Sequence, residues 1–254
     1  MWNMLRVASS GLQAQQRALD VSANNLANTR TTGFKSRRVN LVDVKPAEAT
    51  FGTPGNAAPA QVGEGVDVGA ILPNWAPGSP MPSEHPLDVA IAGDGFLQVT
   101  LPDGRTAYTR DGAIRVDADG QLGIGPGRLN PPIALPPGAA NPAIAPNGQV
   151  TAEITPGDRQ VIGQIELARF PNPDGLEATG ENMFVATPAA GAPVVGAPGA
   201  DGLGALVPGH LESANVDAAE ELVRVMTAQR AYSINLRLLR TADELLQEAA
   251  NLRR

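Results

Sequence analysis

Side chains suited to catalysis are scarce in this sequence. A serine or threonine nucleophile needs a base within reach, and the chain has only two histidines, His85 and His210. His85 stands beside a proline in a predicted turn, and His210 precedes a predicted helix, so we interpret both as solvated loop residues. The absence of cysteine excludes thiol nucleophiles and disulfides. We therefore predict no catalytic residue.

Two short motifs resemble ligand-binding loops but lack essential parts. Residues 123–127, Gly-Ile-Gly-Pro-Gly, contain a proline that removes one backbone donor, and no Lys-Ser or Lys-Thr follows as in a phosphate-binding loop. Residues 117–120, Asp-Ala-Asp-Gly, begin like a calcium loop, but the glycine comes too early and no bidentate glutamate follows. Two isolated histidines without cysteine do not make a zinc site. Both motifs predict turns, and we expect no cofactor and no metal.

Composition and charge favour an interaction protein and argue against nucleic acid as a partner. The 254 residues include 28 glycines and 23 prolines, which is below the level that marks disorder. The net charge of the chain is −7 and is unevenly distributed. Residues 1–38 carry a net charge of +5, whereas residues 39–211 carry −11. An acidic body is poorly suited to a phosphate backbone. No segment approaches the roughly 20 apolar residues of a membrane span, so we predict no stable membrane insertion and no cleavable signal peptide.

The amino-terminal segment has the period of a helix that packs against another helix. From the first residue onward, apolar and small residues recur at alternating steps of four and three, as in a coiled-coil seam. This pattern predicts a helix over about residues 3–27. We expect its leucines to lie at a subunit interface: Leu5, Leu12, Leu19 and Leu26.

A second helix is predicted over about residues 216–252, with Ser213 or Asn215 as its N-cap. It carries two apolar rows, which together form a stripe too wide for one partner helix. One interpretation buries this helix within its own domain, and the other packs it among several copies of the chain. We place four of its apolar residues at a subunit interface: Val223, Met226, Leu238 and Leu245.

The middle of the chain predicts an arm followed by a β-rich body. Residues 46–65 are rich in proline, glycine and alanine without a period, which indicates a loop or an extended arm. Short strand patterns follow at residues 88–91, 96–100, 113–116 and 164–170, which predict a small antiparallel sheet with one solvated face. The predicted fold is α+β, with the terminal helices in a coiled-coil-like bundle. The predicted domains are the terminal helices (1–35 and 212–254), an extended arm or loop (36–70) and the β-rich body (71–211).

Motifs at both ends resemble those of flagellar rod and hook proteins. Residues 23–35, Ala-Asn-Asn-Leu-Ala-Asn-Thr-Arg-Thr-Thr-Gly-Phe-Lys, resemble the signature that ends the first helix in this family, and residues 229–232 resemble its C-terminal helix motif. Segments at 88–96, 107–112 and 175–182 resemble, in the same order, the members that build the distal rod. The residues that carry the family motif are Asn24, Asn25, Leu26, Ala27, Asn28, Gly33, Phe34, Gln229, Arg230, Ala231 and Tyr232.

The resemblance implies a structural, non-enzymatic subunit that polymerises helically into the distal rod of the flagellar basal body and transmits torque from motor to hook. Its implied partners are other copies of itself, proximal rod proteins, the hook protein, the P- and L-ring proteins and the flagellar type III export apparatus. The implied location is the rod that spans the periplasm. The arm over residues 45–62 is shorter than the rod-specific extension of the family and differs from it in amino-acid sequence. A proximal rod protein of the same family therefore remains the alternative. A secreted β-rich hydrolase or binding module is a remote alternative.

Overall fold

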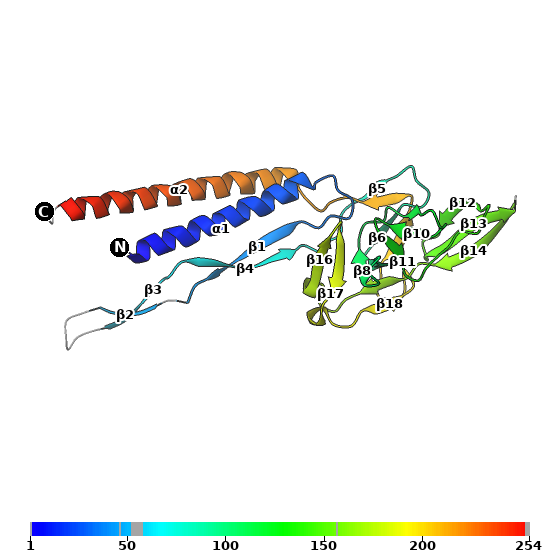
Figure 1. The fold of residues 1–254 in the computed structure, drawn as a ribbon, viewed down its shortest axis with the longest axis horizontal. Helices are drawn as coiled ribbons and strands as arrows, with labels where there is room; N and C mark the ends of the chain where they lie inside the picture. Colours follow the sequence, from blue (N-terminus) through cyan, green and yellow to red (C-terminus); the bar gives the residue numbers. More distant parts are fainter. Residues whose placement is uncertain (1, 46, 52–57, 156, 252–254) are drawn as a thin grey trace. The chain divides into compact units, whose positions relative to one another are not determined.

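A computed structural model of the chain describes residues 2–45, 47–51, 58–155 and 157–251 (Figure 1). The chain divides into two compact units: a helical unit of Met1–Ala27, Arg37–Pro73 and Asp217–Arg254, and a β unit of Asn28–Ser36 and Asn74–Val216. The helices are terminal and the central β-rich body is antiparallel, which confirms the predicted α+β class. Residues 37–70 of the predicted arm fall in the helical unit, and residues 28–35 fall in the β unit.

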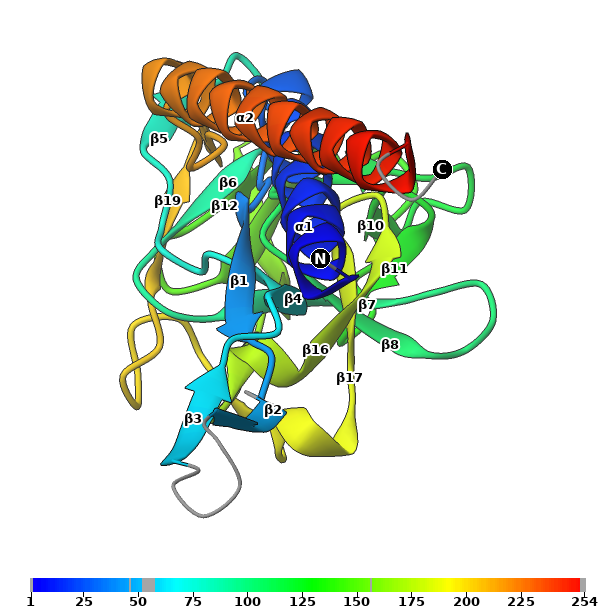
Figure 2. The ribbon, with the colours of Figure 1, turned by 90° about the vertical axis from the view of Figure 1, so that its left-hand side faces the viewer.

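The helical unit consists of two antiparallel helices and a β-ribbon. Helix α1 (Trp2–Ala27) lies between α2 (Ala218–Asn251) and the ribbon in both views (Figures 1 and 2). The ribbon pairs β1 (Arg37–Asp43) with β4 (Val66–Pro73) and β2 (Ala47–Phe51) with β3 (Ala58–Val62). The predicted loop or arm is thus largely paired strand, because cross-strand hydrogen bonds join residues far apart in sequence. Residues 46 and 52–57 of the arm lie outside the described residues.

Asp217 caps the start of helix α2, which differs from the predicted N-cap. Oδ1 of Asp217 accepts hydrogen bonds from the backbone nitrogens of Ala219 (2.8 Å) and Glu220 (3.1 Å). These bonds satisfy amides of the first turn that have no partner within the helix. The prediction of Ser213 or Asn215 was wrong, because the Asn215 side chain is engaged by backbone groups of the β unit.

A nine-stranded antiparallel sheet dominates the β unit, in the order β16-β17-β8-β7-β11-β10-β9, with β15 paired to β7 and β18 paired to β15. Strand β7 lies inside this sheet, and its first four residues are all buried, so the prediction of a small sheet with one solvated face was wrong. A smaller sheet has the order β12-β13-β14, and β6 pairs with β19 and β5 with β20. The bounds are β5 (Pro80–Pro82), β6 (Val89–Ala92), β7 (Phe96–Thr100), β8 (Thr106–Thr109), β9 (Arg115–Val116), β10 (Leu122–Ile124), β11 (Gly127–Leu129), β12 (Ala140–Ile144), β13 (Gln149–Thr155), β14 (Asp158–Gln164), β15 (Leu167–Arg169), β16 (Leu176–Gly180), β17 (Met183–Ala186), β18 (Val194–Gly196), β19 (Ala205–Pro208) and β20 (His210–Glu212), with 3-10 helices at Pro173–Gly175 and Pro188–Ala190.

The core of the β unit has an aliphatic part and an aromatic part. Valine, isoleucine and leucine side chains from most of the strands form the first, with Leu97 and Leu167 fully buried at its centre. The second gathers Phe96, Phe170 and Phe184 with other buried side chains. Burying side chains of this kind stabilises a fold by about 1.5–3 kcal/mol each, so the β unit has a substantial core of its own.

Candidate functional site

Small residues of α1 form the contact with α2. Ala8, Ala14 and Ser22 are buried, and a Cβ atom added to Gly11 would lie only 2.8 Å from Nδ2 of Asn235 on α2. The corresponding face of α2 repeats at alternating steps of four and three, the spacing of a helix-to-helix seam. Its residues are buried or half-buried: Glu221, Val225, Ala228, Tyr232, Asn235, Leu239, Ala242 and Leu246.

Asn25 ties three elements of the helical unit together. Its Nδ2 donates to Oε1 of Glu221 on α2 (3.1 Å) and to the carbonyl oxygen of Arg37 on β1 (2.9 Å), and its Oδ1 accepts from the Arg37 backbone nitrogen (2.9 Å). Asn25 is 1 % exposed, so each of these bonds replaces water that the side chain has lost. The contacts Asn25 with Glu221 and Gly11 with Asn235 are two heptads apart on both helices, which fixes the antiparallel register of the pair.

A second apolar stripe on α2 is exposed. Val223, Met226, Ile234, Leu238 and Leu245 are between 43 % and 57 % exposed. At 100° per residue these positions lie roughly 90–150° around α2 from the centre of the seam that α1 covers. Thus α2 has a second apolar stripe outside the seam, and α1 does not cover it.

The leucines predicted for the interface lie at the edge of the α1 contact. Leu5, Leu12, Leu19 and Leu26 are half-buried, because the small residues beside them let α2 approach α1 closely. These leucines are therefore partly available to a further partner. Among the family-motif residues, Asn25, Gly33 and Phe34 are buried; Leu26, Asn28, Ala231 and Tyr232 are half-buried; and Asn24, Ala27, Gln229 and Arg230 are exposed.

The end of the N-terminal motif is anchored in the β unit by a buried ion pair. Nζ of Lys35 lies 2.5 Å from Oε1 of Glu212 and donates to the Ala76 carbonyl oxygen (2.9 Å), and both charged side chains are 1 % exposed. Nη1 of Arg110 approaches Oε2 of Glu212 at 3.4 Å. Burial lowers the pKa of Lys35, although Glu212 acts in the opposite direction. Both charged groups have lost their hydration, so removing either one would leave the other as an unpaired buried charge and destabilise the fold.

Asn215 joins the same region through backbone groups. Its Oδ1 accepts from the Ser36 backbone nitrogen (2.7 Å), and its Nδ2 donates to the carbonyl oxygens of Asn74 (2.7 Å) and Ala76 (2.9 Å). The three segments joined here, around residues 36, 74 and 215, lie at three of the four places where the chain passes from one unit to the other. Asn215 and Lys35 therefore hold the connecting segments together inside the β unit.

Thr32 of the motif binds Asp111. Its Oγ1 donates to Oδ1 of Asp111 (2.9 Å), and its carbonyl oxygen accepts from Nδ2 of Asn182 (2.8 Å). Burial raises the pKa of Asp111, and the hydrogen bond from Thr32 partly opposes this effect. The N-terminal motif is thus held by side chains from two distant parts of the β unit.

Sequence reasoning missed the residues that hold these motifs. Glu212, Glu221 and Arg110 are buried charged side chains, and the sequence predicted no buried contact for any of them. Lys35 was an available signal, because a lysine that directly follows an apolar residue such as Phe34 requires an acidic partner if it is buried.

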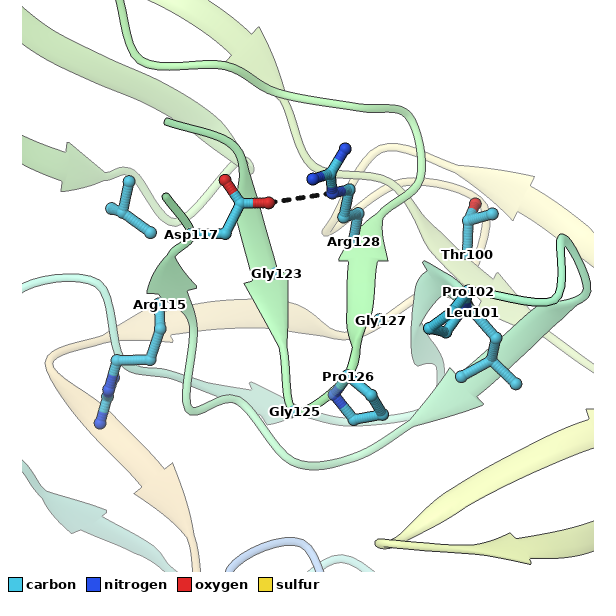
Figure 3. A pocket seen from close by; sticks show the side chains of 11 residues that line it. Thr100, Leu101, Pro102, Arg115, Asp117, Gly123, Gly125, Pro126, Gly127 and Arg128 are labelled. Atoms are coloured by element: carbon cyan, nitrogen blue, oxygen red, sulfur yellow. Dashed lines mark ion pairs between the residues drawn. The ribbon is translucent and has the colours of Figure 1, made fainter. Parts of the chain in front are cut away.

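The glycine motif at residues 123–127 belongs to a β-hairpin beside a cavity of about 650 Å³ (Figure 3). The cavity's arginines are already paired: Nε of Arg128 lies 2.9 Å from Oδ2 of Asp117, and Arg115 binds Asp88. In the described part of the chain, no group of three or more His, Asp or Glu side chains is placed to hold a metal ion. Of the helices described, none combines the length and apolar character needed to cross a membrane.

Three family models match successive parts of the chain. The model for flagella basal body rod proteins matches residues 5–35, that for the D1 domain of the flagellar hook protein FlgE/F/G matches residues 90–152, and that for the C-terminal part of flagellar basal body rod FlgEFG proteins matches residues 207–252. The first and last of these contain the α1 and α2 surfaces described above.

Whole-chain relatives include flagellar basal-body rod proteins FlgG from several bacteria. The chain is 40 % identical to that of Caulobacter vibrioides, with 98 % of each chain covered, and 39 % identical to that of Borreliella burgdorferi, with all of both covered. Identity to the Bacillus subtilis protein is 36 %, over 96 % of this chain and 97 % of the relative. The flagellar hook protein FlgE of Salmonella typhimurium is 37 % identical, but over only 56 % of this chain and 33 % of its own length.

The FlgG relatives are structural proteins of the flagellar rod, and they confirm the prediction of a non-enzymatic protein. The end-to-end match to rod proteins contrasts with the partial match to the hook protein. The chain therefore belongs to the FlgG family of flagellar basal-body rod proteins.

Proposed function

We propose that this chain is the distal rod subunit, that it polymerises helically through its terminal helices, and that the polymer transmits torque from motor to hook. The observation that carries the proposal is the exposed apolar stripe of α2, formed by Val223, Met226, Ile234, Leu238 and Leu245. An apolar stripe outside an already covered seam is expected where a helix packs against more than one neighbour.

The leucine edge of α1 supplies a second part of the same interface. Leu5, Leu12, Leu19 and Leu26 are half-buried within one chain and gain contacts when another copy packs beside α1. Covering the rest of a partly exposed leucine contributes on the order of 1 kcal/mol, so several such residues on two helices sum to a sizeable association energy. Contacts between different faces of identical subunits generate an open helical polymer, as distinct from a closed dimer, when the rotation between subunits does not close a ring.

The further partners follow from the family. The rod subunits join proximal rod proteins at one end and the hook protein at the other, with the P- and L-ring proteins as a bushing. Support for the hook contact is the D1 model, which is shared by hook and rod proteins. We place the polymer across the periplasm, and its subunits reach it through the flagellar type III export apparatus.

Substitution of the exposed stripe tests the polymerisation surface. Leu238→Asp leaves the fold of the monomer intact because Leu238 is 43 % exposed, but it places a charge inside the proposed contact between copies. We expect the variant to fail to form rods in electron micrographs of basal bodies, while Gln13→Asp, at an exposed polar position of α1, assembles normally. Normal rods built from Leu238→Asp would refute the role of this stripe.

A further inference from the structure

The β unit contains an aromatic-lined cavity next to two arginines. The cavity has a volume of about 440 Å³, and its walls include Trp75, Phe96, Phe170, Arg110 and Arg169. The rings pack edge to face, with centroids 5.3 Å apart for Trp75 and Phe96 and 6.1 Å apart for Phe96 and Phe170. Nε1 of Trp75 donates to Oδ1 of Asp174 (2.9 Å), so the indole wall is fixed before any ligand arrives.

Arg110 is incompletely paired within this wall. It is 4 % exposed, and its Cζ lies 5.3 Å from the centroid of the Phe96 ring. One terminal nitrogen donates to the Gly93 carbonyl oxygen (2.9 Å) and the other approaches Glu212 at 3.4 Å. Its Nε is buried and has no hydrogen-bond partner among the described residues. A buried donor without an acceptor is unfavourable, so Arg110 retains unused capacity to bind an anion.

The local charges do not balance. Glu212 is shared between Lys35 and Arg110, and all three side chains are 4 % exposed or less, so this buried set has two basic groups for one carboxylate. Asp94 at the cavity is exposed and attracts Arg110 electrostatically, but within the described residues no hydrogen bond or ion pair joins its carboxylate to either arginine. Arg169 likewise forms no ion pair or side-chain hydrogen bond with any described residue. An additional anion would offset the excess charge.

We propose that this cavity is a binding site for a carboxylate side chain presented on a proline-containing peptide segment. The carboxylate pairs with Arg169 and, after a small rotation of its guanidinium, with Arg110. The proline rings pack against Trp75 and Phe170, as prolines do in aromatic-lined grooves. Rings and charges together favour an acidic peptide over a free inorganic anion, which would leave the aromatic walls uncovered.

The chain itself contains a segment with this chemistry. Residues 82–86 read Pro-Ser-Glu-His-Pro, and Glu84 and Pro86 are exposed. The Glu84 carboxylate has no partner among the described residues. A second copy of the chain would supply this segment in the polymer. The assignment of residues 82–86 of a second copy as the ligand rests on the proposed function. The binding site itself does not rest on it.

Fluorescence of Trp75 tests the site in the dilute full-length chain. The chain has two tryptophans, so Trp2→Phe leaves Trp75 as the single indole. We expect the acetylated, amidated peptide Pro-Ser-Glu-His-Pro to change its emission saturably. A peptide with glutamine in place of glutamate, and the added variant Arg169→Gln, should each weaken binding at least ten-fold. Arg159→Gln, at an exposed arginine on β14, should bind as the parent does.

Three results would overturn the site: no saturable change, equal binding of the two peptides, or unchanged affinity in Arg169→Gln. Because the titration uses dilute chains, failure of polymerisation does not affect it. The source is tested separately with Glu84→Gln in the full chain, which should raise the concentration needed for assembly. An unchanged assembly concentration would exclude residues 82–86 of a second copy as the ligand.

Discussion

Gly33 lies directly against the backbone of Asp111. A Cβ atom at Gly33 would lie 2.5 Å from the Asp111 backbone nitrogen and 2.7 Å from the Arg110 carbonyl carbon. Gly33 also has φ +67°, a conformation that other residues adopt at a cost. The family motif therefore needs glycine at this position for two independent reasons, a close approach and a left-handed backbone.

Gly33→Ala should destabilise the β unit by at least about 3 kcal/mol, because backbone atoms cannot move aside as a flexible side chain can. Chemical unfolding followed by Trp75 fluorescence, with Trp2→Phe in both variants and the parent, measures the loss. The matched control is Gly104→Ala, which has a similar φ of +83° but no heavy atom within 4 Å of the added Cβ, and should cost about 1 kcal/mol. Equal losses of stability in the two variants would mean that the left-handed backbone conformation alone accounts for the cost, without the close approach to Asp111.

Asn25→Ala should destabilise the helical unit by about 2–3 kcal/mol. The substitution removes a hydrogen-bond donor to Glu221, whose other carboxylate oxygen is already buried without a partner among the described residues. Loss of helical circular dichroism on heating measures the effect. Gln16→Ala, at an exposed position of the same helix, should change stability by less than about 0.5 kcal/mol. A similar melting curve for both variants would contradict the proposed importance of the buried contact.

Lys35→Met should cost about 3–5 kcal/mol, because it leaves the Glu212 carboxylate buried with a weaker set of partners. Denaturant unfolding of the full chain provides the measurement. Lys45→Met is the comparison, since Lys45 is exposed and its removal leaves no buried charge. A loss of less than 1 kcal/mol in Lys35→Met would show that Arg110 alone is sufficient for Glu212.

Asp111 should make stability depend on pH in the acidic range. Burial raises the pKa of Asp111 in the folded chain above the ordinary value of an aspartate carboxyl. Its protonated form therefore stabilises the fold fully below that value, and the contribution is lost as pH rises through the folded pKa. The stability of the parent relative to Asp111→Asn should fall as pH rises from 3 and then become constant. A difference that rises with pH would reverse the assigned direction of the shift.

The sequence alone was sufficient for the helices. Their apolar spacing depends on neighbours three and four residues away, and the predicted bounds of about 3–27 and 216–252 agree closely with α1 and α2. The motifs at both ends likewise identified the family, which the whole-chain relatives confirm. The predicted strand at residues 96–100 coincides with β7, although the breadth of the sheet around it did not follow from local pattern.

Only the tertiary structure decided which surfaces are covered. The two apolar rows of α2 have similar composition, and it is the position of α1 that buries one face and leaves Ile234 and Leu238 exposed on the other. Asn25 donates a hydrogen bond to Glu221, which is 196 residues away in the sequence, and Lys35 pairs with Glu212, which is 177 residues away. Such partners are invisible to a local pattern, because a buried polar group is satisfied by whichever segment the fold brings within hydrogen-bond distance. The sequence specified the helices and the motif, whereas long-range packing determined which residues hold them and which stay free for another copy.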